Sequence, residues 1–286
     1  MIPKKWRSPS GGLFLAVCVL AIAHGQAQPK RIISLVPNVT EILFAIGAGP
    51  QVVAVSNYDV EPPEVRSLPT VGALIDPDTE KILSLRPDLV VTYGSQSELQ
   101  AQLKRASIPF FDYRHGGLDH IMVTMRALGA RTGHVEEAER AAHRLQASID
   151  AVKARVAGRP RPRTLLVFGR EPGSLRNIYA SAGRGFLHDM LVAAGGEDVL
   201  SDIDKESAQV STEMILARKP DVILELNAAT RLNDADLKAV TDPWMTLSSV
   251  PAVRNKRVII LTGPGMTVPG PRVVDGLEKM AKALHP

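Results

Sequence analysis

From residue 31 onward, short runs of apolar and β-branched residues alternate with stretches in which apolar residues recur at helical spacing. The run that follows Asp88 is apolar without polar alternation, as is typical of strands covered by helices on both faces. The pattern therefore predicts an α/β fold with mainly parallel sheets. In its first part the predicted strands cover residues 32–36, 52–56 and 89–93, and the predicted helices cover residues 40–47 and 79–85.

One segment of the chain recurs in its second half. Residues 80–91 read Glu-Lys-Ile-Leu-Ser-Leu-Arg-Pro-Asp-Leu-Val-Val, and residues 213–224 read Glu-Met-Ile-Leu-Ala-Arg-Lys-Pro-Asp-Val-Ile-Leu. Each copy predicts a short helix that begins at an acidic residue, stops at Pro-Asp and leads into a strand. The repeated unit predicts two equivalent Rossmann-like lobes.

Between the two copies lies a long segment without glycine or proline, residues 135–157, in which apolar residues recur at helical spacing. This segment predicts one long helix, which the following Gly-Arg-Pro-Arg-Pro-Arg sequence ends. We therefore expect an N-terminal lobe over residues 28–133, a single connecting helix over 134–158 and a C-terminal lobe over 159–286. Ligands of parallel sheets bind beyond the carboxyl ends of the strands, so we expect a ligand cleft between the lobes.

Residues 1–27 have the features of a secretory signal peptide. Lys4, Lys5 and Arg7 precede an apolar run that is too short to span a bilayer, and small residues before position 28 suit a signal peptidase. The pattern predicts that the chain is exported.

The only cysteine, Cys18, lies inside that apolar run, so the mature chain contains no disulfide. A lipid anchor at Cys18 is the less favoured alternative, because Val17 stands where a lipoprotein signal has a small residue.

The charge and the motifs restrict the function. The formal net charge of +4 includes three cations of the signal peptide, and the remaining +1 excludes a nucleic-acid-binding footprint. The sequence has no phosphate-binding glycine loop, zinc-protease motif, nucleophile elbow or paired cysteines. We therefore predict that the protein is not an enzyme, has no catalytic residues, and holds no intrinsic metal or cofactor.

Several segments together resemble one known family, the helical-backbone (class III) periplasmic substrate-binding proteins of ABC importers. They are residues 31–49, 58–63, 68–72 and 194–200 and both copies of the repeat, so that the likeness spans nearly the whole mature chain. The resemblance implies a periplasmic, monomeric protein whose partners are a permease in the inner membrane and a small-molecule metal chelate. Members bind corrinoids such as cobalamin, haem or ferric siderophores.

The resemblance also implies a docking role for Glu80 and Glu213, because in the family one surface glutamate on each lobe engages basic residues of the permease. Two carboxylates at equivalent places suit a permease built from two like subunits. The alternative is that both acids merely favour a helix N-terminus, since Asp78 and Ser211 are predicted N-caps.

Candidate ligand contacts lie at predicted strand ends. In cobalamin-binding members aromatic residues hold the corrin, and our alignment places Leu74 and Ser207 where such members carry tryptophan. Arg114 and His115 have the chemistry to hold a propionate, a phosphate or a metal, and a strand-end tyrosine has the chemistry to bind iron. Each residue has a simple structural alternative as a loop or packing residue. The candidates are Pro37, Asn38, Tyr58, Leu74, Tyr93, Gly94, Ser95, Tyr113, Arg114, His115, Arg170, Tyr179, Asn227 and the segment from Gly263 to Met266.

Two other classes of function remain open at this point. An exported metal-dependent enzyme could reuse the same frame, and it would require His115, His120 and His188 to converge. A sensor module could bind a membrane protein without delivering cargo.

Overall fold

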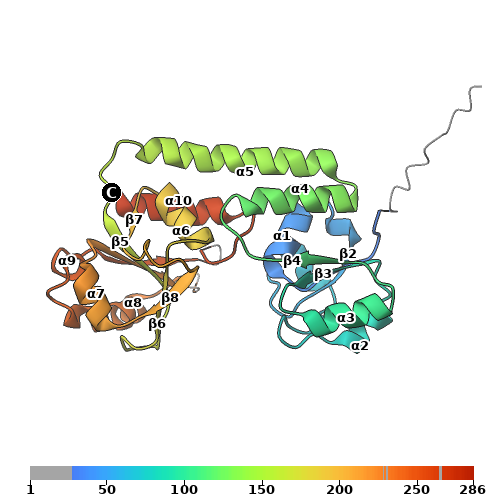
Figure 1. Cartoon of the computed structure of the whole chain (residues 1–286), viewed down its shortest axis with the longest axis horizontal. Helices are drawn as coiled ribbons and strands as arrows, with labels where there is room; N and C mark the ends of the chain where they lie inside the picture. The colour runs from blue at the N-terminus through green and yellow to red at the C-terminus, as the bar shows by residue number, and fades with distance from the viewer. Residues whose placement is uncertain (1–27, 228, 230, 264–265) are drawn as a thin grey trace, which may run out of the picture.

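Two lobes, each built on one β-sheet, lie side by side beneath a layer of helices (Figure 1). The computed structural model describes residues 28–227, 229, 231–263 and 266–286. The predicted signal peptide and Cys18 lie outside the described residues.

The N-terminal sheet is entirely parallel, with strand order β2-β1-β3-β4. Strands β1, β2 and β3 are fully or largely buried because helices cover both faces of the sheet, as their unbroken apolar sequences predict, whereas the edge strand β4 is mostly half-buried. The strands are β1 (Ile32–Ser34), β2 (Val52–Val55), β3 (Leu89–Tyr93) and β4 (Phe110–Tyr113). The helices are α1 (Pro37–Ala45), α2 (Thr79–Ser84), α3 (Ser97–Arg105) and α4 (His120–Thr132), with 3-10 turns η1 (Gly49–Gln51) and η2 (Pro63–Ser67).

The C-terminal sheet is mixed, with strand order β10-β9-β5-β6-β8 and the short β7 beside β5. Strands β10, β9, β5 and β7 are parallel, whereas β6 is antiparallel to both β5 and β8. Its strands are β5 (Arg163–Gly169), β6 (Ile178–Ser181), β7 (Glu197–Asp198), β8 (Ser207–Val210), β9 (Val222–Asn227) and β10 (Val258–Thr262). The helices are α6 (Phe186–Ala193), α7 (Thr212–Arg218), α8 (Asp234–Thr241), α9 (Pro251–Arg254) and α10 (Val273–Leu284), with the 3-10 turn η3 (Asp242–Thr246).

The predicted long helix is present as α5 (Val135–Val156), and it runs across both lobes (Figure 1). Its apolar stripe is buried on α4, α6 and α10, and the helix stops before Gly158, whose φ is +74°. One continuous apolar core includes side chains from this helical layer and from both sheets. No helix in the described part of the chain is long and apolar enough to cross a bilayer.

Side-chain contacts join the lobes in addition to α5. Arg272, just before α10, donates two hydrogen bonds to the Glu41 carboxylate on α1, with N to O distances of 2.7 and 2.9 Å. The amide nitrogen of Asn38 donates to the Pro269 carbonyl at 3.2 Å. The backbone N–H of Leu118, before α4, donates to Asp189 Oδ2 on α6 at 2.8 Å. The sequence predicted α5 as the single connection, and these contacts add to it.

Candidate ligand-binding cleft

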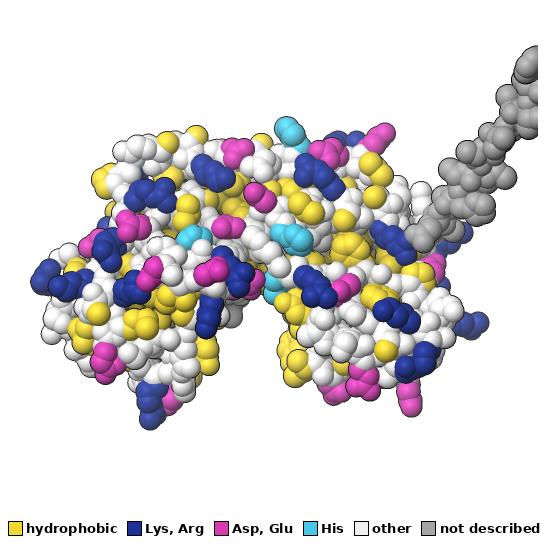
Figure 2. Space-filling model, viewed as in Figure 1, with side chains coloured by type: hydrophobic (Ala, Val, Ile, Leu, Met, Phe, Trp, Pro, Cys, Tyr) yellow, Lys and Arg dark blue, Asp and Glu magenta, His cyan; other side chains and the backbone are white. Residues whose placement is uncertain are grey.

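A deep hollow separates the two lobes on the side away from α5 (Figure 2). Hydrophobic side chains line the wall of the N-terminal lobe that faces this hollow (Figure 2). Because all four strands of the N-terminal sheet are parallel, their carboxyl ends meet at one edge, and the loop that follows β4 lies on the hollow's side (Figure 1). The loops at this edge therefore hold the candidate ligand contacts of the N-terminal lobe.

Four ring side chains cluster at the carboxyl ends of β3 and β4 and in the segment that follows β4, and we call them the β3–β4 cluster: Tyr93, Tyr113, His115 and His120. The ring centroids of Tyr93 and His115 are 5.0 Å apart, and those of Tyr113 and His115 are 5.5 Å apart in an edge-to-face arrangement. Tyr113 also lies 6.2 Å from Tyr93 and from His120. The hydroxyl of Tyr113 is 3.3 Å from Nδ1 of His115, within hydrogen-bonding distance.

Burial changes the proton affinities in this cluster. Desolvation raises the pKa of Tyr113 to about 12 and also raises the pKa of Tyr93. Desolvation of the imidazole against the two tyrosines lowers the pKa of His115, which favours its neutral form at neutral pH. Burial therefore favours the neutral forms of Tyr93, Tyr113 and His115.

Arg114 places a positive charge beside this cluster. Its guanidinium pairs with Asp112 Oδ2 at 3.1 Å, yet its side chain is 72% exposed. A Cβ atom on Gly94 would lie 3.1 Å from Cγ of Arg114, so glycine at the end of β3 permits this close packing. The exposed guanidinium can donate hydrogen bonds to a carboxylate or a phosphate of a ligand.

Glu206, just before β8 of the other lobe, lies near enough to the β3–β4 cluster for its charge to act on Tyr93, Tyr113 and His115. Burial has the largest effect on the pKa of each of these three rings. The negative charge of Glu206 adds to the rise for Tyr93 and Tyr113, and it partly opposes the lowering for His115. Glu206 was not predicted, because its one signal in the sequence is its position beside Ser207, which aligns with a family tryptophan. The close approach depends on pairing between distant segments.

The other predicted contacts of the N-terminal lobe lie around the same edge. Asn38 is buried and bound to Pro269, while Tyr58 is 66% exposed in the loop after β2. Leu74 is half-buried, and its carbonyl accepts a hydrogen bond from the buried Gln96 at 2.8 Å. Gln96, which was not predicted either, also accepts from the Tyr93 N–H at 2.8 Å. Pro37 begins α1, and Ser95 is exposed directly after Gly94.

The structure corrects the expectation for Arg170. Its side chain is only 4% exposed and pairs with Glu225 at 3.0 Å. The remaining guanidinium nitrogens donate to the carbonyls of Ser174 and Val240, and the group lies 5.5 Å from the ring of Trp244. All three guanidinium nitrogens therefore bind groups inside the C-terminal lobe, and Arg170 is not available to a ligand.

The remaining candidates of the C-terminal lobe differ in how accessible their side chains are. Met266 is only 1% exposed, so its side chain does not face the cleft. The Asn227 side chain accepts from the Ala229 N–H at 2.9 Å, at the carboxyl end of β9. Tyr179 is 44% exposed on β6 and contacts Phe168. Between Gly263 and Met266, residues 264–265 lie outside the described part.

Glu80 and Glu213 occupy equivalent positions. Each is the exposed second residue of a short helix, and the Asp78 and Ser211 side chains accept from the backbone N–H of the third residue at 2.9 and 3.2 Å. A hydrogen bond with Ser211 lowers the pKa of Glu213, with a smaller effect from its own backbone amide. Their helices, α2 and α7, both lie on the side of their lobe away from α5 (Figure 1).

The three histidines that a metal-dependent enzyme would need do not converge. His115 and His120 share the β3–β4 cluster, whereas His188 pairs with the buried Asp198 at 3.2 Å in the C-terminal lobe. Within the described residues, no group of three or more His, Cys, Asp or Glu side chains could hold a metal ion.

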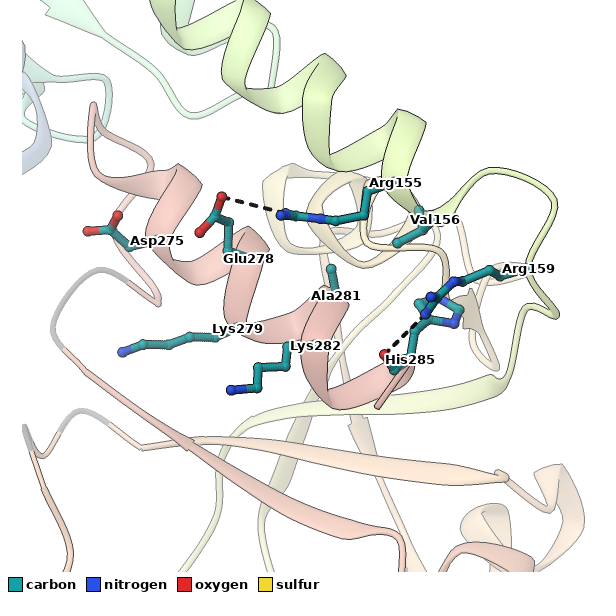
Figure 3. A pocket seen from close by; sticks show the side chains of 9 residues that line it. All are labelled: Arg155, Val156, Arg159, Asp275, Glu278, Lys279, Ala281, Lys282 and His285. Carbon is teal, nitrogen blue, oxygen red and sulfur yellow. Dashed lines mark hydrogen bonds and ion pairs between the residues drawn. The ribbon is translucent and has the colours of Figure 1, made fainter.

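A second groove, of about 590 Å³, lies between the C-terminal ends of α5 and α10 (Figure 3). Two of its cationic side chains are engaged within it. Arg155 pairs with Glu278 at 3.5 Å and Arg159 donates to the His285 carbonyl at 3.2 Å (Figure 3).

Comparisons with known proteins agree with this geometry. A sequence profile described as periplasmic binding protein matches residues 32–264. The vitamin B12-binding protein of Pectobacterium atrosepticum is 29% identical over 279 residues, which cover 95% of both chains.

Solved structures show the same architecture. The periplasmic vitamin B12 binding protein BtuF of Vibrio cholerae has a TM-score of 0.75 at 26% identity, over 90% of this chain and 96% of that one. The periplasmic haem-binding protein RhuT from Roseiflexus sp. RS-1 has a TM-score of 0.73 at 29% identity, over 90% and 98% of the two chains. These relatives are binding proteins and not enzymes.

Proposed function

The chain belongs to the periplasmic binding protein family, and from this premise we propose that it is the substrate-binding protein of an ABC importer that captures a metal chelate. The observation that carries the proposal is the cleft itself. Its N-terminal wall combines the β3–β4 cluster with the exposed guanidinium of Arg114, and the charge of Glu206 acts on this cluster from the other lobe.

This combination suits a large, flat chelate with acidic side groups. Aromatic rings and apolar wall residues contact the face of such a ligand, and Arg114 pairs with a carboxylate or phosphate on its edge. The chelate is a corrinoid such as cobalamin, a haem or a ferric siderophore. The names of the relatives support the first two of these, since they are described as vitamin B12- and haem-binding proteins.

The proposed ligand contacts are the predicted residues that the structure leaves accessible or places at the cleft edge. Tyr58, Leu74 and Ser95 extend the contact surface from the β3–β4 cluster along the edge of the N-terminal sheet. Tyr179 and Asn227 are the proposed contacts on the C-terminal lobe.

Docking on the permease completes the proposed cycle. Glu80 and Glu213 are exposed carboxylates at matching positions on the two lobes, which supports their role as a pair that binds basic residues of the permease. Residues 1–27 are the proposed signal peptide for export to the periplasm, and the protein acts as a monomer.

The test is purification of the protein from its native host, followed by absorption spectroscopy and mass spectrometry of the bound material. A corrin, a porphyrin or a ferric siderophore is expected, and each has a distinct spectrum and mass. Recovery of a metal-free sugar, peptide or amino acid would contradict the proposed cargo class.

A further inference from the structure

The imidazole of His115 is held in one orientation with one nitrogen free. Nδ1 is 3.3 Å from the Tyr113 hydroxyl, and the ring packs against both Tyr113 and Tyr93. Nε2 has no hydrogen-bond partner among the described residues, and His115 is exposed at the cleft edge. A neutral imidazole whose other nitrogen is hydrogen-bonded is the usual arrangement of a metal-binding histidine.

The tyrosines of the cluster are not placed for this task. The Tyr113 side chain is only 3% exposed, and its hydroxyl is occupied by His115. Tyr93 is half-buried under the same imidazole. Metal ligation by a cluster phenol would therefore require the cluster to come apart, whereas His115 needs no rearrangement.

Because His115 offers one free nitrogen, it can bind only a metal complex that needs a single ligand from the protein. A bare ion requires several ligands from the protein, and no group of three or more donors that could hold one occurs in the described residues. A planar macrocycle supplies four nitrogen ligands itself and leaves an axial position for one protein ligand. A hexadentate siderophore leaves no such position.

We propose that His115 binds the cargo's metal through Nε2, and that the cargo is a macrocyclic chelate with an exchangeable axial ligand. This inference rests on the proposed function. The Nε2 lone pair forms a dative bond to the metal, and the water molecule in the axial position leaves. Tyr113 acts as a positioning residue that fixes the imidazole through Nδ1.

Two cobalamins that differ only in the axial ligand provide the test. Aquacobalamin carries an exchangeable water, whereas cyanocobalamin carries a tightly held cyanide. Purified protein is titrated with each, with ferric protoporphyrin IX as a further exchangeable probe and with ferrioxamine B as a fully chelated one. Binding constants and absorption spectra are recorded for wild type, His115→Ala and His115→Gln.

The proposal expects a shifted absorption band when wild type binds aquacobalamin or the ferric porphyrin. In both variants the shift is lost, and affinity for the exchangeable probe falls about tenfold or more. Added free imidazole restores the band in His115→Ala. Affinity for cyanocobalamin or ferrioxamine B, where either binds, changes less than threefold.

His143→Ala is the matched control, because His143 is exposed on α5 and remote from the cluster. It keeps the wild-type band, and circular dichroism with thermal melting shows that all variants fold. A band that persists in both His115 variants overturns the inference and leaves the proposed function intact, as does binding of the exchangeable probes without any shift. Failure of folded wild type to bind any of the four chelates overturns both.

Discussion

Tyr113 is the buried centre of the β3–β4 cluster, and its environment has a direct spectroscopic consequence. Burial raises its pKa to about 12, compared with about 10 for an ordinary tyrosine. Folding favours the neutral phenol, so the stability gained from its burial is complete below pH ~10 and is lost as pH rises through about 12.

We therefore predict a late phase in the alkaline titration of tyrosine absorbance, measured on ligand-free protein. Tyr113→Phe should remove the part of this phase that titrates near pH 12 and leave the contribution of Tyr93, whose pKa is also raised, and the whole phase should be absent from urea-unfolded protein. A wild-type titration that is complete with an ordinary tyrosine pKa would show that the Tyr113 phenol is solvated.

The ion pair of Arg170 and Glu225 is buried, and it links β5 and β9 to the turn that carries Trp244. Trp244 Nε1 donates to Glu225 Oε2 at 2.6 Å, so the carboxylate is bonded on both oxygens. Removing one partner leaves an uncompensated buried charge.

Arg170→Ala should lower the free energy of unfolding by about 3–5 kcal/mol. The exposed pair of Arg114 and Asp112 provides the control, since Arg114→Ala should cost about 0–1 kcal/mol. Urea unfolding measures both. The double change Arg170→Ala with Glu225→Gln should recover part of the loss, and a cost of Arg170→Ala no larger than that of Arg114→Ala would contradict this account.

The two short helices α2 and α7 begin where their predicted N-cap residues stand in the sequence. Each begins with a capping side chain, Asp78 or Ser211, which satisfies a backbone N–H that the helix cannot pair. The predicted repeat therefore folds as two equivalent helix starts, which present Glu80 and Glu213.

For α7 the cap also controls the acidity of Glu213. The Ser211 hydroxyl is the largest cause of the lowered pKa, so Ser211→Ala should raise the pKa of Glu213 towards its ordinary value. A lowered pKa of Glu213 stabilises the folded state at pH values above the unfolded-state pKa. In wild type this stabilisation is lost as the pH falls through the folded-state pKa. The Ser211→Ala variant should lack the stabilisation over the whole pH range. NMR titration of the Glu213 side chain measures the shift, with Thr246→Ala as a remote hydroxyl control.

The sheets illustrate a limit of local patterns. The apolar runs predicted strands correctly, and the N-terminal sheet is parallel as expected. The antiparallel strand β6 was not predicted, because a strand's direction depends on which partner it meets and not on its own sequence. This strand brings β8, and with it Glu206, to the cleft side of the lobe.

The two lobes and their helical layer form one frame, and the proposed docking depends on that frame because it uses one carboxylate from each lobe. The Glu80→Ala, Glu213→Ala double variant should retain wild-type affinity for the co-purified chelate but lower its uptake about tenfold or more, since both docking charges are lost. Uptake is measured in native-host cells that carry the variant in place of wild type.

The matched control is Glu98→Ala with Glu136→Ala. Each of these is also the exposed second residue of a helix, in α3 and α5, so the charge change and helix position are the same. Undiminished uptake by the Glu80 and Glu213 variant, or an equal loss in the control, would refute the docking pair.

The resemblance to class III periplasmic binding proteins is confirmed by the matching profile and by the relatives, and the two-lobed α/β fold is confirmed by the solved structures. The absence of catalysis is supported by relatives that are binding proteins. The assignments of Glu80 and Glu213 to docking and of the cleft residues to ligand binding stay predictions.

The sequence by itself determined the features that depend on nearby residues: the alternation of strands and helices, the apolar stripe of α5, and the capped starts of α2 and α7. Periodicity and capping act within a few turns of backbone, so they can be read along the chain. Only the tertiary structure decided that Arg170 pairs with Glu225, that Arg272 binds Glu41, and that the charge of Glu206 acts on His115. Electrostatic and hydrogen-bond partners are chosen by proximity in space, and that proximity exists only after distant segments pack together.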